Sequence, residues 1–312
     1  MLGAAPRLAR VIAVDAHEGP AYAADEDALY FTSLPAAGPG AGAPRVSVRR
    51  IELDGERFPL EADRVSTIRP DANVANGMAL DRAGRLVACE QGTRSRPAAI
   101  TRFDRRGERI ETLVDGSDGR PLNSPNDVAV KGDGTVWFTD PSYGHLQGFR
   151  PEPRGGDHVY RYDPASGFLS VVAESFDKPN GLAFSPDERT LYVGDSGANQ
   201  EPGSFHPERP HHIKAFDVVD GRRLGAERAF TVIAPGFPDG IKIDAAGRVY
   251  ASSYTGVQVF DPGGALIGEI AVAGAVNFTF GGPDGNVLFI TADDAVWAAV
   301  LAATGPSTPR GA

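Results

Sequence analysis

The chain alternates short apolar runs with polar turns, and one arrangement of the two recurs six times. Each copy opens on Asn, Asp or Glu, enters an apolar stretch, passes a turn rich in Asp, Gly or Pro, and ends in a second apolar stretch. The copies are EGPAYAADEDALYFTS from Glu18, NGMALDRAGRLVACE from Asn76, NDVAVKGDGTVWFTD from Asn126, NGLAFSPDERTLYVGD from Asn180, DGIKIDAAGRVYASS from Asp239 and NFTFGGPDGNVLFITA from Asn277. Successive copies start 38 to 59 residues apart, close to the roughly 40 to 50 residues of a four-stranded propeller blade.

The turn within each copy predicts a pair of antiparallel strands. DRAGR, KGDGT and DAAGR place Asp and Gly where a tight connection needs an Asx turn or a positive φ. Further strand pairs, such as AAITRFDRRGERIETLV and HVYRYDPASGFLSVVA, lie between the copies and supply two more strands to each blade. The pattern therefore predicts an all-β fold, a six-bladed β-propeller.

The two ends of the chain predict how the ring closes. The last copy has room for only about three strands before the tail TGPSTPRGA, and the strand LARVIAVDA precedes the first copy without belonging to a complete blade. An unpaired sheet edge is a liability, so we expect the N-terminal strand to close the last blade. This predicts one domain over residues 1–312, with a disordered tail from about 304 to 312. A solenoid or a sandwich of repeated hairpins is the alternative, but neither gives the first strand a place.

The first residue of each copy points to a polar ring. The innermost strands of a propeller run along its central channel, so equivalent positions surround one axis. The ring position carries oxygen-bearing side chains in all six copies, namely Glu18, Asn76, Asn126, Asn180, Asp239 and Asn277. Buried polar groups are costly unless water or a cation satisfies them. The alternative is that these residues only turn or cap the starts of the strands.

The donor types indicate which cation such a ring would hold. Carboxylate and amide oxygens, without His or Cys, are hard ligands and favour Ca²⁺. Mg²⁺, Mn²⁺ and Zn²⁺ are the alternatives.

Charge and cysteine content narrow the range of partners. The net charge of -10 is spread along the chain without a basic block, which argues against nucleic acid and anionic membranes as partners. Cys89 is the single cysteine, which fits a reducing compartment. No apolar run reaches the length of a signal peptide or of a bilayer span. We therefore expect a cytoplasmic protein that acts on a small molecule. The sequence does not indicate an oligomeric state.

The motifs at the ring resemble the SMP-30/gluconolactonase/luciferin-regenerating (LRE) family, in particular its bacterial gluconolactonase branch, over essentially the whole chain. The matching strings are HEGP, LNSPNDVAV with GTVWFTDPSYG, KPNGLAFSPDERTLYV and PDGIKID. The resemblance implies a calcium-dependent propeller whose metal ligands match Glu18, Asn126, Asn180 and Asp239. Whether Asn126 binds metal or substrate stays open.

The resemblance also implies a reaction, the metal-assisted hydrolysis of a sugar-derived or related small lactone to its hydroxy acid. The ion would polarise the lactone carbonyl, and Asp239 would act as general base toward water. The candidate substrate contacts are Asn76, Asn123, Asp140, Tyr143 and His145. SMP-30-type members carry an Arg close before the residue matching Asn126, whereas this chain has Asn123 and Ser124, so their mode of substrate recognition is not carried over.

Two other functions fit the same pattern. One is a metal-dependent esterase or phosphotriesterase of the diisopropylfluorophosphatase or paraoxonase type. The other is a non-catalytic binding propeller in which the channel ion is structural. Calcium-dependent acid release from aldono-lactones would separate an enzyme from a binding module.

Overall fold

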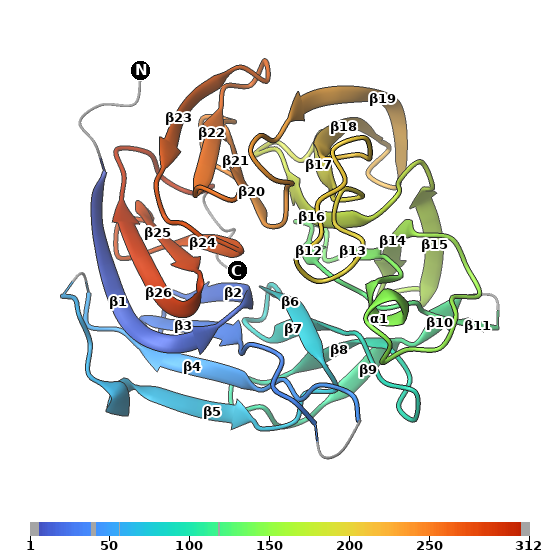
Figure 1. Ribbon diagram of the computed structural model, residues 1–312, viewed down its shortest axis with the longest axis horizontal. Helices are drawn as coiled ribbons and strands as arrows, with labels where there is room; N and C mark the ends of the chain where they lie inside the picture. The colour runs from blue at the N-terminus through green and yellow to red at the C-terminus, as the bar shows by residue number, and fades with distance from the viewer. Residues whose placement is uncertain (1–5, 39–41, 56, 118, 307–312) are drawn as a thin grey trace.

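The computed structural model describes residues 6–38, 42–55, 57–117 and 119–306. Within them, six four-stranded antiparallel sheets stand in a ring around a central axis, with β2, β6, β12, β16, β20 and β24 innermost (Figure 1). The predicted six-bladed β-propeller is confirmed.

The blades are numbered in chain order from the first copy. Blade 1 contains β2 (Glu18–Ala23), β3 (Ala28–Thr32), β4 (Val48–Glu52) and β5 (Val65–Arg69); blade 2 contains β6 (Ala75–Leu80), β7 (Leu86–Glu90), β8 (Ala99–Phe103) and β9 (Glu111–Val114). Blade 3 contains β12 (Val128–Val130), β13 (Val136–Asp140), β14 (His158–Asp163) and β15 (Phe168–Ala173); blade 4 contains β16 (Pro179–Phe184), β17 (Thr190–Asp195), β18 (His212–Val219) and β19 (Arg223–Val232). Blade 5 contains β20 (Ile241–Ile243), β21 (Val249–Ser252), β22 (Val257–Phe260) and β23 (Leu266–Ile270); blade 6 contains β24 (Asn277–Gly281), β25 (Val287–Thr291), β26 (Asp293–Val300) and β1 (Arg7–Ala16).

Helical and accessory elements are few in the described ranges. They are a 3₁₀ turn, η1 (Ala62–Arg64), one short helix, α1 (Tyr143–Leu146), and a small hairpin of β10 (Gly116–Ser117) and β11 (Arg120–Pro121). No helix among the described residues is long and apolar enough to cross a membrane.

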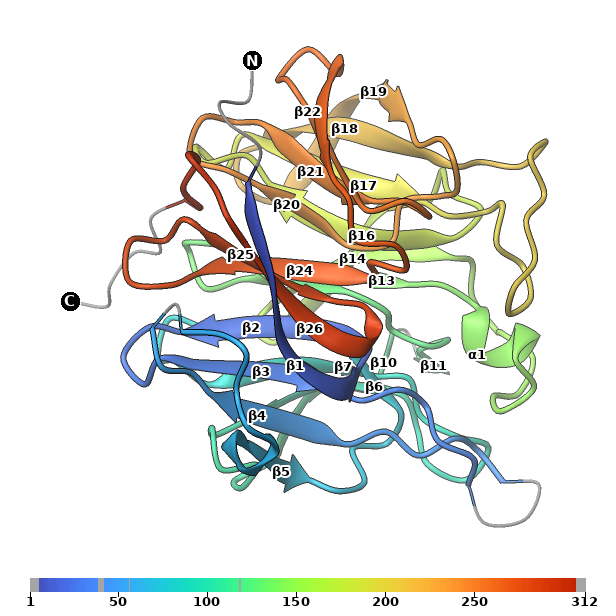
Figure 2. The same cartoon turned by 60° about the vertical axis from the view of Figure 1, so that its left-hand side comes forward.

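Strand β1 closes the ring as predicted. It pairs antiparallel with β26 from Arg7 opposite Val300 to Ala16 opposite Asp293, and Figure 2 shows the two strands running side by side. Val11 and Ile12 of β1 are buried in a cluster that joins blade 6 to blade 1 through Phe31 and Phe289. The first strand therefore contributes both a sheet edge and core packing.

The prediction of one domain over 1–312 stays a prediction. Its tail from about 304 lies largely outside the described residues. Of the part described, Gly305 donates its N–H to the carbonyl of Gly285, and the carbonyl of Thr304 accepts from the N–H of Ala245, both at 2.9 Å.

Asx turns join the strands within the copies, as their sequences predict. The Asp244 carboxylate accepts the N–H groups of Ala246 and Arg248, both at 2.9 Å, and the Asp81 carboxylate does the same for Ala83 and Arg85. Each turn satisfies backbone donors that neither strand can reach.

The core lies between neighbouring blades. Trp137 of blade 3 is fully buried and packs in one cluster with Leu191 and Phe216 of blade 4. Each inner strand thereby keeps a fixed place around the channel, which positions the residues at its start.

Candidate active site

The inner strands bring their leading residues close to the axis. Glu18 begins β2, Asn180 lies at the start of β16, and Asp239 directly precedes Gly240 and β20. A glycine follows each of these three residues because the next backbone comes too near for a side chain. A Cβ on Gly181 would lie 2.0 Å from the carbonyl oxygen of Asp239, and one on Gly240 would lie 2.7 Å from Cα of Asn277.

Three of the predicted metal ligands meet through their side chains. The charge of Asp239 raises the pKa of Glu18, and Glu18 and Asn180 lower the pKa of Asp239. The N–H of Gly181, next to Asn180, donates to the carbonyl of Asp239 at 3.0 Å. Glu18 Oε2 also accepts the backbone N–H of Gly19 at 3.0 Å and Nδ2 of Asn277 at 2.7 Å. Serine 252 holds the backbone of Asp239, because its Oγ accepts the Asp239 N–H at 3.0 Å.

Burial makes the two acids costly to ionise side by side. Burial, reinforced by the charges of Asp239 and Asp127, raises the pKa of Glu18 well above its usual value. Burial, with a further contribution from Asp127, raises the pKa of Asp239 to about 7. A bound cation or protonation of one acid would offset the repulsion between the two carboxylates.

Several ring amides present buried oxygens without a partner. Oδ1 of Asn76, Asn126 and Asn180 has no hydrogen-bond donor among the described residues. The backbone of Asn126 is fixed, since its N–H donates to Thr139 at 2.9 Å and its carbonyl accepts from Gly77 at 2.7 Å. Each unpaired buried amide oxygen costs about 1–3 kcal/mol of folding stability. Such oxygens are also ligands that a hard cation binds.

Among the described residues, no group of three or more His, Cys, Asp or Glu side chains could hold a metal ion. The ring would have to use amide oxygens as well as carboxylates.

Asp127 and Lys242 also belong to the channel, although the sequence analysis did not single them out. Asp127 is buried, and Lys242 Nζ lies 4.0 Å from its Oδ2. The signal was present in the repeat: a glycine follows the ring residue in four copies, whereas the third copy has Asp127. A carboxylate in place of a glycine beside the axis indicates a second polar layer.

The sequence matches the family described as SMP-30/gluconolactonase/LRE-like region over residues 16–294. The chain belongs to this family. A gluconolactonase of Zymomonas mobilis is 30% identical over 260 residues, which cover 81% of this chain and 69% of that protein. A lactonohydrolase of Aspergillus oryzae is 26% identical over 93% of this chain and 69% of its own length. Among solved structures, a gluconolactonase of Xanthomonas campestris superposes with a TM-score of 0.77 and 35% identity, covering 95% of this chain and 90% of that one.

In this member of the SMP-30/gluconolactonase family, two predicted substrate residues support the segment that leads to Asn126. Asp140 ends β13, and its two carboxylate oxygens accept the N–H groups of Asn123 and Ser124, both at 2.9 Å. Nδ2 of Asn123 donates to the carbonyls of Asp140 and Gly156. These side-chain atoms are engaged with the protein, and a substrate role for either residue stays a prediction.

The other predicted substrate residues lie at different depths. Tyr143 is buried and its hydroxyl donates to the carbonyl of Ser196 at 3.1 Å, whereas His145 is exposed on α1. Asn76 is half-buried on the ring. Substrate contact by these three also stays a prediction.

The buried Arg150 ties together the loops around α1. Its guanidinium donates to the carbonyls of Asn123, Leu122 and Thr93 at 2.8 to 2.9 Å and to that of Arg96 at 3.2 Å. An arginine that follows α1 thus fixes the segment before Asn126.

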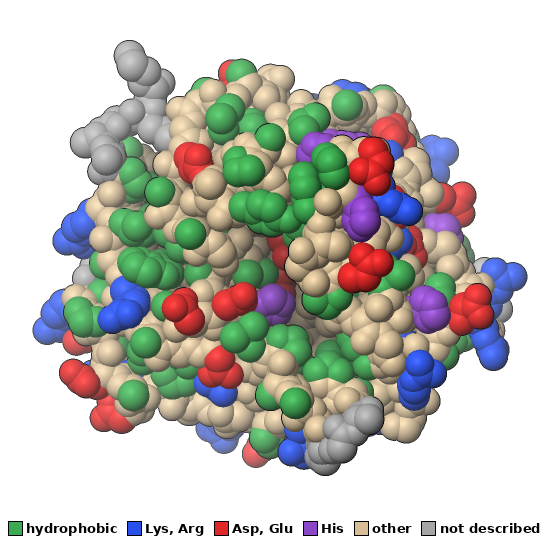
Figure 3. Space-filling model, in the orientation of Figure 1, with side chains coloured by type: hydrophobic (Ala, Val, Ile, Leu, Met, Phe, Trp, Pro, Cys, Tyr) green, Lys and Arg blue, Asp and Glu red, His purple; other side chains and the backbone are tan. Residues whose placement is uncertain are grey.

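An aromatic group borders the segment that carries Asp239. The Tyr254 ring lies edge-on to Phe205 at 5.8 Å and to Phe237 at 5.6 Å between centroids. Phe205 and Tyr254 remain 39% and 46% exposed. Figure 3 shows a hollow near the middle of the face that it draws, with hydrophobic side chains beside it. We call these three residues the aromatic rim.

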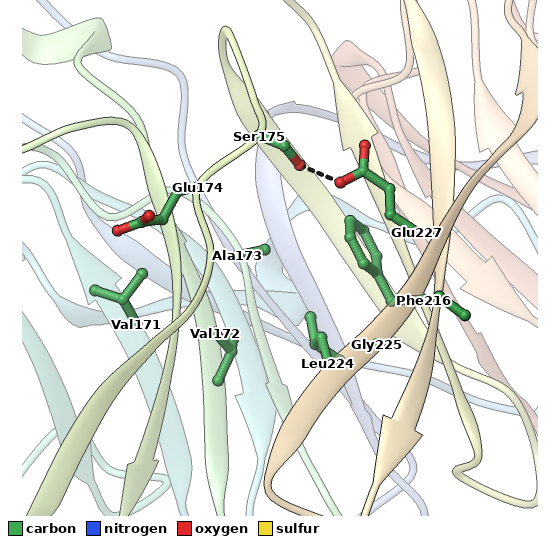
Figure 4. Close-up of a pocket in the computed structure, with 10 residues that line it drawn as sticks. Val171, Val172, Ala173, Glu174, Ser175, Phe216, Leu224, Gly225 and Glu227 are labelled. Carbon is green, nitrogen blue, oxygen red and sulfur yellow. Dashed lines mark hydrogen bonds between the residues drawn. The ribbon is translucent and has the colours of Figure 1, made fainter.

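A groove of about 710 Å³ lies away from the channel, between the outer strands β15 and β19 (Figure 4). Its one paired acid, Glu227, contacts Ser175 and forms an ion pair of 2.8 Å with Lys214. The groove is lined by none of the predicted site residues.

Proposed function

We propose that this protein is a lactonase that hydrolyses a sugar-derived or related small lactone to its hydroxy acid with the help of a divalent cation, Ca²⁺ in the first place. The observation that carries the proposal is the meeting of Glu18, Asn180 and Asp239 at the channel. The names gluconolactonase and lactonohydrolase, borne by relatives that match most of this chain, support the reaction.

The residues fit a hard cation. Glu18 and Asp239 would supply the negative charge, and Oδ1 of Asn180 and Asn126 are buried acceptors without a donor. When bound, a divalent ion in such a site polarises a carbonyl group and stabilises the negative charge that develops on its oxygen, a contribution of several kcal/mol. The donor set favours Ca²⁺, with Mg²⁺, Mn²⁺ and Zn²⁺ as alternatives to be compared.

The chain's own residues would place and move the proton. Asp239 lies at the ring and is half-buried, and its carboxylate would act on a water molecule that enters the channel. It would take a proton from the attacking water as the water oxygen bonds to the carbonyl carbon. The ring C–O bond then breaks, and the departing oxygen receives that proton, so one water molecule is added overall. The aromatic rim would exclude other water and orient the lactone.

An esterase or phosphotriesterase could use the same ring, and a binding propeller could hold the ion without turnover. We prefer the lactonase hypothesis because the relatives named above are called gluconolactonase or lactonohydrolase. Phosphotriester and aryl ester substrates belong in the same assay.

The test measures acid release from D-glucono-δ-lactone, corrected for spontaneous opening, before and after exhaustive chelation and after return of each cation. We expect chelation to abolish turnover, Ca²⁺ to restore it, and Glu18→Gln and Asp239→Asn to remove it with the circular dichroism spectrum retained. Asp294→Asn is the matched control, since Asp294 is an exposed acid near the start of β26. Full activity after chelation would refute the metal role, and binding of Ca²⁺ without turnover of any ester or lactone would refute the enzyme.

A further inference from the structure

Lys242 places a positive charge inside the channel, next to the acids of the ring. It lies on β20, just after Asp239 in the chain, and its side chain is 26% exposed. Its Nζ donates to the carbonyl of Ile241 at 3.1 Å and to Oδ1 of Asn277 at 3.3 Å, and it lies 4.0 Å from Oδ2 of Asp127. The ammonium is therefore anchored on two sides and held toward an acid.

Asn277 connects this ammonium to Glu18 with a fixed polarity. Its Oδ1 accepts from Lys242 and from the backbone N–H of Phe278 at 2.8 Å, so its Nδ2 faces Glu18 Oε2 at 2.7 Å. A reversed amide would set an NH₂ group against two donors. Because the Phe278 N–H alone keeps this orientation, removing the lysine changes the charge at the site more than its shape.

Three acids, Glu18, Asp127 and Asp239, interact through their charges, and Asp127 is the one that Lys242 faces directly. The charges of Asp127 and Asp239 oppose ionisation of Glu18, and the charge of Asp127 opposes that of Asp239. Lys242 acts in the opposite direction, since its charge counters the effect of burial on the pKa of Asp127. Like charges gathered in a buried site destabilise it unless a cation compensates them.

We propose that Lys242 is a built-in counter-charge of the ring, which stabilises the metal-free protein and weakens its hold on a divalent cation by competing for the same acids. This inference deepens the proposed function and rests on it only for the identity of the competing cation. The lysine charge therefore has two effects. It stabilises the clustered acids of the metal-free protein, and it lowers the affinity for the cation so that the cation can exchange.

The experiment compares wild type with Lys242→Met, Asp127→Asn and the double variant, using calcium titration calorimetry and urea unfolding of the chelated protein. A unit charge about 6 Å from a divalent ion, screened by channel water at an effective dielectric of about 80, changes the affinity on the order of tenfold, and weaker screening makes the change larger. We expect Lys242→Met to bind Ca²⁺ about tenfold more tightly and to unfold at lower urea when metal-free. Asp127→Asn should bind about tenfold more weakly, and the double variant should return to within about threefold of wild type.

Lys242→Arg, which keeps the charge, is the control and should stay within about threefold of wild type. If Lys242→Met does not fold, recovery of folding in the double variant supports the counter-charge, and failure of both to fold counts against it. Unchanged Ca²⁺ affinity in Lys242→Met, or strictly additive changes in the metal-free unfolding free energy across the cycle of Lys242→Met and Asp127→Asn, overturns the inference. Absence of any divalent binding by wild type overturns the proposed metal instead, and the metal-free unfolding cycle still decides the role of Lys242.

Discussion

Arg150 offers the sharpest test of how the loops around the site are held. Its guanidinium donates to four backbone carbonyls, and two of them, those of Leu122 and Asn123, belong to buried residues. The carbonyls of Thr93 and Arg96 belong to residues that water reaches. In Arg150→Met the exposed pair can turn to water, whereas the buried pair loses its donors.

The magnitude follows from those two buried acceptors. Each costs about 1–3 kcal/mol when left unpaired, so we expect Arg150→Met to lower the free energy of unfolding by about 2–6 kcal/mol. Arg150→Lys can reach at most some of the four carbonyls and should fall between wild type and Arg150→Met. Because Leu122 and Asn123 lead directly to Asn126, calcium affinity should also weaken.

The assay is urea unfolding of the metal-free protein, followed by tryptophan fluorescence. Arg228→Met is the matched control, since Arg228 donates to the Asp217 carboxylate and the Ala226 carbonyl but its side chain is 47% exposed. Its loss should cost less than about 1 kcal/mol. A loss in Arg150→Met no larger than that of the control would refute the reasoning.

Three further predictions test the ring closure, the titration of the site and the aromatic rim. Ile12→Ala on β1 removes a buried side chain and should lower the free energy of unfolding by about 2–5 kcal/mol. Leu8→Ala, at an exposed position of the same strand, is the control. An effect of Ile12→Ala no larger than that of the control would show that β1 adds no core packing. Because burial raises the pKa of Asp239 to about 7, above its ordinary value, the folded metal-free protein holds that proton more tightly than the unfolded chain, so unfolding free energy should rise as pH falls from about 7 toward 4. Calcium affinity should fall over the same range as protons compete, and a pH slope equal in Asp239→Asn and wild type would contradict this assignment. Tyr254→Ala should raise KM more for an alkyl-substituted lactone than for unsubstituted γ-butyrolactone, whereas an equal change for both would exclude contact between the rim and the substituent.

The features that define the propeller locally can be predicted from the sequence. Repeats at blade spacing, Asx turns such as those at Asp81 and Asp244, and a first strand without a partner are all short-range features, since each depends on residues close together in sequence. The ring positions of Glu18, Asn180 and Asp239 could be predicted for the same reason, because the repeat gives each one the same position on its strand. The repeat does not predict the residues and contacts in which one blade differs from the others.

Only the tertiary structure decided the contacts between repeats. Asp127 and Lys242 lie on different blades and meet at 4.0 Å, and Arg150 reaches carbonyls of Thr93 and Leu122 from the far side of α1. Distances between blades depend on how whole sheets pack and on how side chains choose rotamers across the channel, and no periodicity in the chain records them. The sequence by itself therefore determined the blades, their closure and the oxygen-rich ring, while the packing of the blades decided which charges balance that ring and which groups hold its loops.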